Sequence, residues 1–185
     1  VIDLRDGVAA RPRTIIDRAD VCLAGIQDWS PDGQRVLVTL MRTGEPRQLA
    51  WVSVVDGATQ AVKSFVDDGP QISSRARVSP DGRYIAYAAG TAAFAGTPTP
   101  LPSGPKSPLN RKLYVLSSGG GPEALIVTPT MDSAQPLWSI DDQLVFRGDD
   151  DLWSVPMRDG RAAGQAVRLV RAIGVAQALA LTAGG

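Results

Sequence analysis

The side chains that could carry acid–base, nucleophilic or metal chemistry are few in this sequence and poorly placed for it. Histidine is absent, which removes the usual general base and the usual partner of a serine or cysteine nucleophile. The single cysteine, Cys22, cannot close an intrachain disulfide or complete a thiolate zinc site, so we expect it to be a small core residue. The serine-rich stretch 116–120 lacks the Gly-x-Ser-x-Gly pattern of a nucleophile elbow. The sequence therefore assigns no catalytic, cofactor-binding or metal-ligating residue.

The densest run of carboxylates is Asp149-Asp150-Asp151, which could supply oxygen ligands to Ca²⁺. Three adjacent aspartates lack the alternating spacing and the bidentate glutamate of a dedicated calcium loop, so we interpret them as part of a solvated turn. They are also adjacent rather than placed across a cleft, as the two carboxylates of a glycosidase are. Asp32 and Asp81 recur in a repeated motif, and we expect them to accept hydrogen bonds in turns and not to act as acid catalysts.

The balance of charge argues against nucleic acid and anionic membranes as partners. Lys plus Arg and Asp plus Glu both number 19 in a chain of 185 residues, so the basic excess that such partners demand is missing. No apolar run approaches the ~20 residues that a membrane span needs, and the N-terminus lacks the pattern of a signal peptide. Because the chain opens on Val1 and Ile2 in what reads as a strand, we expect any targeting segment to lie upstream.

The elements that position these residues repeat along the chain. Ser-Pro-Asp-Gly occurs at 30–33 and recurs 49 residues later at 79–82, with a degenerate, shorter copy at 139–142 and an apparent fourth copy at 181–185. Serine, proline, aspartate and a left-handed glycine in this order predict a tight hairpin turn. Apolar runs follow the first three copies and predict strands over 35–40, 83–87 and 143–146.

Two further elements complete each repeat. A strand closed by a glycine turn is predicted at 49–57, 112–120 and 151–160, and residues 1–7 have the same form. A final short strand is predicted near 13–16, 61–65, 123–127 and 166–170. Four short antiparallel strands that recur every ~40 to 50 residues, without helical periodicity between them, are typical of a propeller blade.

The repeated Ser-Pro-Asp-Gly turn, the apolar strand after it and the aromatic-bearing strand that ends in Asp-Gly resemble the TolB-like, WD-repeat-like β-propeller family over nearly the whole chain. The third copy departs from this pattern at Ile140 and Asp142. The resemblance implies an all-β fold, namely a β-propeller fragment of about three four-stranded antiparallel blades plus partial blades at both ends. We expect the end of one blade at 1–20, blades at 21–70, 71–130 and 131–174, and the start of the next at 175–185.

Two features of this arrangement bear on binding. Residues 91–110, in the middle blade, contain a proline at nearly every second position from Pro98 on, which predicts an extended, solvated loop projecting from one face, with recognition of its polyproline conformation as the alternative. Tryptophans recur at two strand positions, and we expect them to seal the layers between blades rather than to stack on a ligand. These tryptophans are Trp29, Trp51, Trp138 and Trp153, with Val78 and Tyr114 filling the same places in the middle blade.

The favoured function is a non-catalytic scaffold that binds a protein partner through a propeller face, because repeat arrays present loops on one side while their cores are used for stacking. One alternative is the substrate-gating propeller of a prolyl-oligopeptidase-like serine peptidase whose catalytic domain lies outside this segment. Another is the sensory propeller of a bacterial regulator. The family resemblance favours the periplasm or cell envelope, and an arc of three blades is expected to need the remaining blades of its parent chain.

Overall fold

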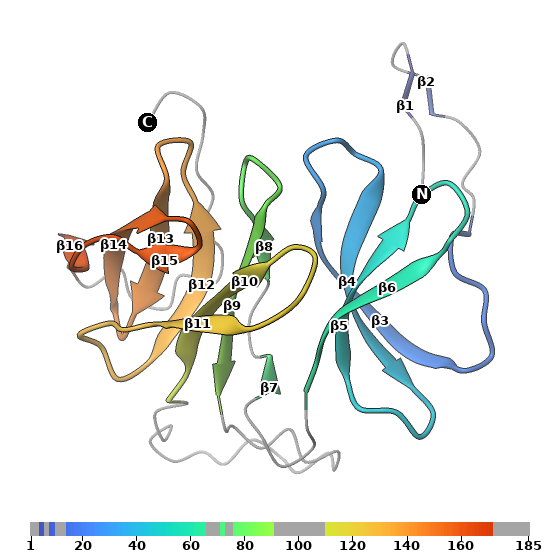
Figure 1. Ribbon diagram of the computed structural model, residues 1–185, viewed down its shortest axis with the longest axis horizontal. Helices are drawn as coiled ribbons and strands as arrows, with labels where there is room; N and C mark the ends of the chain where they lie inside the picture. The colour runs from blue at the N-terminus through green and yellow to red at the C-terminus, as the bar shows by residue number, and fades with distance from the viewer. Residues whose placement is uncertain are drawn as a thin grey trace.

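The described residues form three antiparallel sheets of four or five strands, which lie side by side (Figure 1), and one separate two-stranded hairpin. The computed structural model describes the backbone of residues 4–5, 8–9, 14–65, 71–72, 76–90 and 110–171, and the side chains of this set apart from 4–5, 8–9, 22–24 and 71–72. Strands and turns account for the regular structure of these residues, with no helix among them and hence no helix that could cross a membrane. The prediction of an all-β propeller arrangement of blades is confirmed.

The first blade follows the predicted order of strands without a crossover. Each strand pairs with the next along the chain, which is what short hairpin turns impose. Its strands, from the inner edge outward, are β3 (Val21–Trp29), β4 (Arg35–Arg42), β5 (Gln48–Ser53) and β6 (Thr59–Ser64).

The second and third blades vary this plan at one edge each. In the second blade two short described strands, β7 (Gln71–Ile72) and β8 (Arg77–Val78), take the first position and both pair with β9 (Tyr84–Gly90). The sheet then continues through β10 (Lys112–Ser117) to β11 (Glu123–Ile126). In the third blade the last position is divided, because β15 and β16 both pair with β14. Its strands are β12 (Ser133–Trp138), β13 (Gln143–Gly148), β14 (Asp151–Arg158), β15 (Arg161–Ala162) and β16 (Val167–Val170).

The segment before the first blade differs from the prediction. Residues 4–5 (β1, Leu4–Arg5) pair with 8–9 (β2, Val8–Ala9) in a small hairpin of their own. The strand predicted near 13–16 is wrong for the described residues 14–16, which form no strand. Ile15 and Ile16 pack instead on the outer face of the first blade. The carbonyl oxygen of Ile15 passes so close to Gly57 that a Cβ there would lie 2.2 Å away, so this segment crosses the β5–β6 turn rather than extending a sheet.

The predicted Ser-Pro-Asp-Gly turns have the expected hydrogen bonds. The Ser30 hydroxyl donates to Asp32 Oδ1 at 2.6 Å and accepts from the N–H of Arg35 at 2.9 Å. The third copy keeps this geometry although it departs from the motif, because Asp142 takes the left-handed φ of 57° that Gly33 and Gly82 adopt at 68° and 73°. Aspartate is one of the few residues that tolerate this region.

Two apolar layers hold the blades together. The layer between the first and second blades contains Leu37 and Trp51 from one side and Ile85 and Tyr87 from the other. The layer between the second and third blades has the same construction, with small alanines of β9 facing large residues of β13 and β14. Alternate residues of β9 and β10 enter opposite layers, as the two-residue period of a strand requires.

The aromatic residues are not all equivalent. Trp51 pairs with Leu37 and faces the second blade, whereas Tyr114 pairs with Tyr87 and faces the first. The expectation that Trp51 is equivalent to Tyr114 and Trp153 is therefore wrong. The position of Trp51 in its strand differs by one residue from that of the other two, and so its side chain lies on the opposite face of its sheet. The other expected set, Trp29, Val78 and Trp138, does share one position at the end of the first strand, but Trp29 is 45% exposed and seals no layer among the described residues.

Polar side chains join the inner strands of neighbouring blades. The Gln27 Oε1 atom accepts from the N–H of Ala76 at 3.0 Å, and the Asp28 Oδ2 atom accepts from the N–H of Val78 at 2.9 Å. The indole of Trp138 donates to the carbonyl oxygen of Arg77 at 3.1 Å. These bonds fix the spacing of the blades at their inner edge, where backbones of different sheets cannot pair directly.

Candidate functional site

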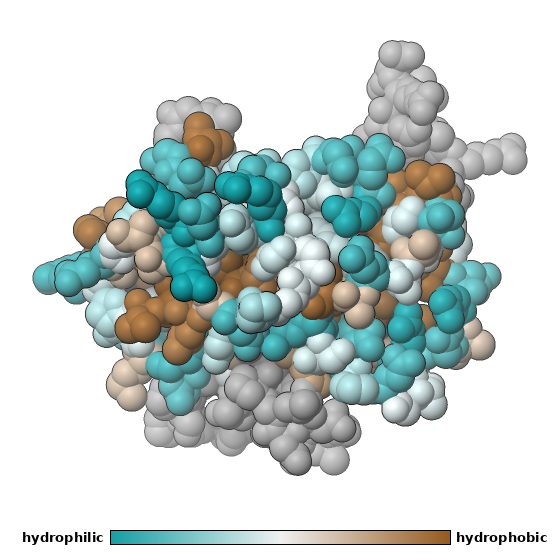
Figure 2. Space-filling view, in the orientation of Figure 1, coloured by the Kyte–Doolittle hydropathy of each residue, from teal (hydrophilic) through white to brown (hydrophobic). Residues whose placement is uncertain are grey.

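Exposed apolar side chains concentrate on the outer strands of the second and third blades. On and just after β11, Leu125 is 52% and Val127 is 79% exposed, and every residue of β16 is exposed, including Val167, Leu169 and Val170. The equivalent outer strand of the first blade, β6, has the polar sequence Thr-Gln-Ala-Val-Lys-Ser and buries its valine. Figure 2 shows the corresponding apolar surface in brown where Figure 1 places β11 and β16. Apolar side chains left exposed on these outer strands are candidates for contact with a partner.

A groove of about 980 Å³ runs between these two blades. One wall is the outer edge of the second blade over residues 122–129, which includes β11, and the other is the third blade over 159–162 and 164–166. The wall on the third blade carries small residues, Ala162, Gly164 and Ala166, so the groove stays wide along β11. Within the described residues β11 pairs only with β10, and residues of both strands line the groove.

One end of the groove carries a pair of arginines on adjacent strands. Arg158 and Arg161 lie directly opposite each other in β14 and β15, a placement that repels like charges. Neither forms an ion pair with any residue that the structure describes. Arg161 lines the groove together with Asp159, and Arg158 and Arg83 line an adjoining cleft of about 330 Å³ whose other charged residues are Asp81, Asp141, Asp142 and Asp159.

The other end is anchored to the first blade by a cluster of charge and aromatic rings. The Glu123 carboxylate accepts a hydrogen bond from the Tyr87 hydroxyl and lies 2.9 Å from the Lys63 ammonium. The Tyr87 ring stacks on Tyr114 with centroids 5.5 Å apart and meets Phe65 edge-on. Burial, and then the bond to Glu123, raise the pKa of Tyr87 above its ordinary value, so this hydroxyl stays protonated and acts as a donor.

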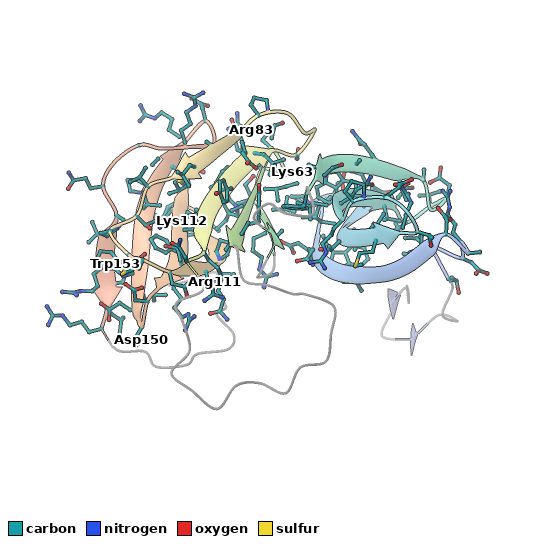
Figure 3. All side chains as sticks on the ribbon, turned by 90° about the horizontal axis from the view of Figure 1, so that it is seen from below. Lys63, Arg83, Arg111, Lys112, Asp150 and Trp153 are labelled. Atoms are coloured by element: carbon teal, nitrogen blue, oxygen red, sulfur yellow. The ribbon has the colours of Figure 1, made fainter. Side chains whose placement is uncertain are left out.

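A second polar cluster lies where β10 and β12 begin. It is formed by Arg111, which Figure 3 labels, and Asp132. The buried Arg111 side chain holds Asp132 through its Nε atom at 2.8 Å and through a second guanidinium nitrogen, joining the second blade to the third. Burial acts to raise the pKa of Asp132, but the hydrogen bonds and charge of Arg111 outweigh it and hold that pKa below its usual value. This pair satisfies itself, so we assign it to structure.

The aspartate run 149–151 forms the predicted turn. Asp149 has a φ of 52°, and its carboxylate accepts from the N–H of Asp132 at 3.1 Å. Asp151 pairs with Arg168 at 3.1 Å, while Asp150 lies in the turn between β13 and β14. No group of three or more carboxylate, histidine or cysteine side chains in the described part of the chain could hold a metal ion.

The remaining residues singled out in the sequence are placed as follows. Asp32 and Asp81 accept hydrogen bonds in their turns, as predicted, and Ser117 closes the turn at 117–120 by accepting from the N–H of Gly120 at 2.9 Å. The backbone of Cys22 belongs to β3, but its side chain lies outside the described residues. The proline-rich stretch 91–109 and the expected start of a further blade at 175–185 also lie outside them. Sequence analysis missed the groove, for which the apolar Leu125 and Val127 near a strand end were the only local signal.

Comparison with known proteins shows the fold and no more. No protein-family model matches the chain, and no curated protein is similar to it. Among solved structures it is similar to a putative TolB from Agrobacterium tumefaciens (22% identity, TM-score 0.58) over 88% of this chain and 50% of that chain. It is also similar to TolB from Acinetobacter baumannii (17% identity, TM-score 0.57) over 91% of this chain and 36% of that one.

A third similar structure is a chain of a nidogen/laminin complex, at 10% identity and a TM-score of 0.57, with 90% of this chain and 56% of that chain covered. The chain thus spans about half or less of the length of the first two proteins. The fold is that of a TolB-like β-propeller.

Proposed function

We propose that this chain is a non-catalytic propeller scaffold whose blades, divided near 21–70, 71–130 and 131–174, present a binding site for a partner protein. The observation that carries the proposal is the groove of about 980 Å³, whose lining includes the exposed apolar residues Leu125 and Val127 on and just after β11. Burying apolar surface of this kind supplies the main driving force of protein association. A similar fold occurs in a chain of the nidogen/laminin complex, which supports the proposal in general terms.

The experiment is site-specific photocrosslinking in the source cell. A benzoylphenylalanine placed at Leu125 or Val127 is expected to form crosslinks to a discrete partner protein, because both residues line the groove and are exposed. The matched control places the same group at Gln60, an exposed residue of the polar outer strand β6. Crosslinks of equal yield from Gln60 and Leu125, or none from either apolar position, would contradict the proposal.

A further inference from the structure

We infer that Met131 is a modification site, at which a peroxide oxidises the thioether to the sulfoxide while the chain stays folded. The inference goes beyond the proposed function, because the described lining of the groove and of the adjoining cleft does not include Met131. It rests on the exposure of the three methionines, on the contacts of the turn that carries Met131 and on the chemistry of a thioether.

The first step is the difference in exposure among the methionines, all three of which the structure describes. Met131 is 67% exposed and lies on the connection between β11 and β12. Met157 is 7% exposed, because it packs among the apolar residues of the layer between the second and third blades. Met41 is partly buried, and its sulfur accepts a hydrogen bond from the Arg47 guanidinium at 3.8 Å. A small oxidant in water therefore reaches Met131 more easily than the other two.

The second step is the way the backbone beside Met131 is held. On one side Thr130 is 6% exposed, and its hydroxyl lies 2.7 Å from that of Ser133. On the other side the Asp132 carboxylate accepts from the buried Arg111 guanidinium at 2.8 Å. These contacts belong to the residues beside Met131 and not to its thioether. A chemical change at the Met131 sulfur therefore leaves them intact.

The third step is the chemistry. A lone pair of the Met131 sulfur attacks one oxygen of hydrogen peroxide, the O–O bond breaks, and after proton transfer the other oxygen leaves as water. The sulfur loses two electrons, the peroxide gains them, and the new S–O bond is that of methionine sulfoxide. A sulfoxide is polar, so it disrupts an apolar core but is solvated at an exposed position. The fold should therefore tolerate oxidation at Met131 and not at Met157.

The test treats the intact chain with hydrogen peroxide and follows the oxidation of each methionine by peptide mass spectrometry. The same time course in concentrated guanidinium chloride gives the rate of each methionine in the unfolded chain. Relative to that reference, Met131 should react about tenfold faster than Met157, since their exposed fractions, 67% and 7%, differ by about that factor. Equal relative rates for the two, or a faster reaction at Met41 than at Met131, would overturn the inference.

The variant Met131→Leu is the matched control, because it keeps an apolar side chain of similar size and removes the sulfur. Met157 should react equally slowly in the variant and in the parent chain. Thermal unfolding of the parent chain should be unchanged once Met131 is fully oxidised, and methionine sulfoxide reductases should restore the original mass of its peptide. A faster reaction of Met157 in the parent chain, or a lowered unfolding temperature after oxidation of Met131, would show that the modification opens the fold and would refute the inference.

Discussion

A serine hydroxyl organises each of the three turns by acting in two directions. It donates to the aspartate two residues later, and it accepts from the backbone N–H that begins the following strand. In the second blade this bond from Ser79 is the main reason that the pKa of Asp81 falls to about 2, and the same bond from Ser30 lowers the pKa of Asp32. The repeated motif is therefore a local network that needs an ionised carboxylate.

Replacing Ser79 by alanine should raise the pKa of Asp81 from about 2 toward its ordinary value of 3.8. A depressed pKa contributes stability above the ordinary value that is lost as the pH falls toward about 2, so the variant should lose less stability between pH 4 and 2 than the parent chain. Titration of the carboxyl carbon by NMR measures the shift. Asp32, which is untouched, serves as the internal control, and an unchanged pKa at Asp81 would refute the assignment of the cause.

At the scale of the elements, turn glycines combine conformational freedom with close packing. Gly33 and Gly160 have almost the same left-handed φ, 68° and 72°, but different surroundings. A Cβ at Gly33 would meet nothing within 4 Å, whereas one at Gly160 would lie 2.6 Å from the ring of Tyr84 in the neighbouring blade. The β14–β15 turn is thus packed against the second blade at the end of the groove.

The two alanine variants should therefore differ in stability. Gly33→Ala carries only the strain of a left-handed residue and should lower the free energy of unfolding by about 1 kcal/mol. Gly160→Ala adds the clash with Tyr84 and should cost about 1 to 3 kcal/mol more. Urea denaturation of both variants measures the difference. Equal losses would show that the turn moves away from Tyr84 at no cost, which would also weaken the description of the groove.

Across the whole molecule, the blades cohere through layers that combine apolar packing with a few placed hydrogen bonds. The indole of Trp51 reaches across to the carbonyl oxygen of Ser118 at 2.8 Å, and Tyr87 reaches Glu123 from within the same layer. Lys63 of the first blade completes this contact from the other side at 2.9 Å, in the region that Figure 3 labels. Each layer therefore has polar bonds that fix how neighbouring sheets are aligned.

Tyr87→Phe should lower the free energy of unfolding by about 1.5 to 3 kcal/mol, the range for a hydrogen bond to a charged group, because it removes the hydroxyl and keeps the ring. Tyr114→Phe is the matched control, since Tyr114 stacks on Tyr87 but its hydroxyl has no hydrogen bond among the described residues. Calorimetric unfolding should show the larger loss for Tyr87→Phe. Comparable losses in the two variants would mean that ring packing, and not the bond to Glu123, aligns the blades.

Local residue patterns were enough to specify the turns of this fold and the short strands beside them. The turn residues of 30–33 and 79–82 specify their geometry through bonds within five residues, so they were predicted correctly, as were the strands that follow them. Even the third turn could be located, although only the structure showed that Asp142 replaces glycine in its left-handed position.

The face that each strand residue occupies and the position of the groove depend on how the sheets pack against one another. Trp51 and Tyr114 look equivalent in sequence, but a shift of one residue in pairing sends them into the same layer from opposite blades. The bond from Asp28 to Val78 joins residues 50 positions apart, and the groove is bordered by two edges whose proximity depends on such contacts. A two-residue period in the sequence shows that side chains alternate between the two faces of a strand. It does not show which of the two sets faces the neighbouring sheet.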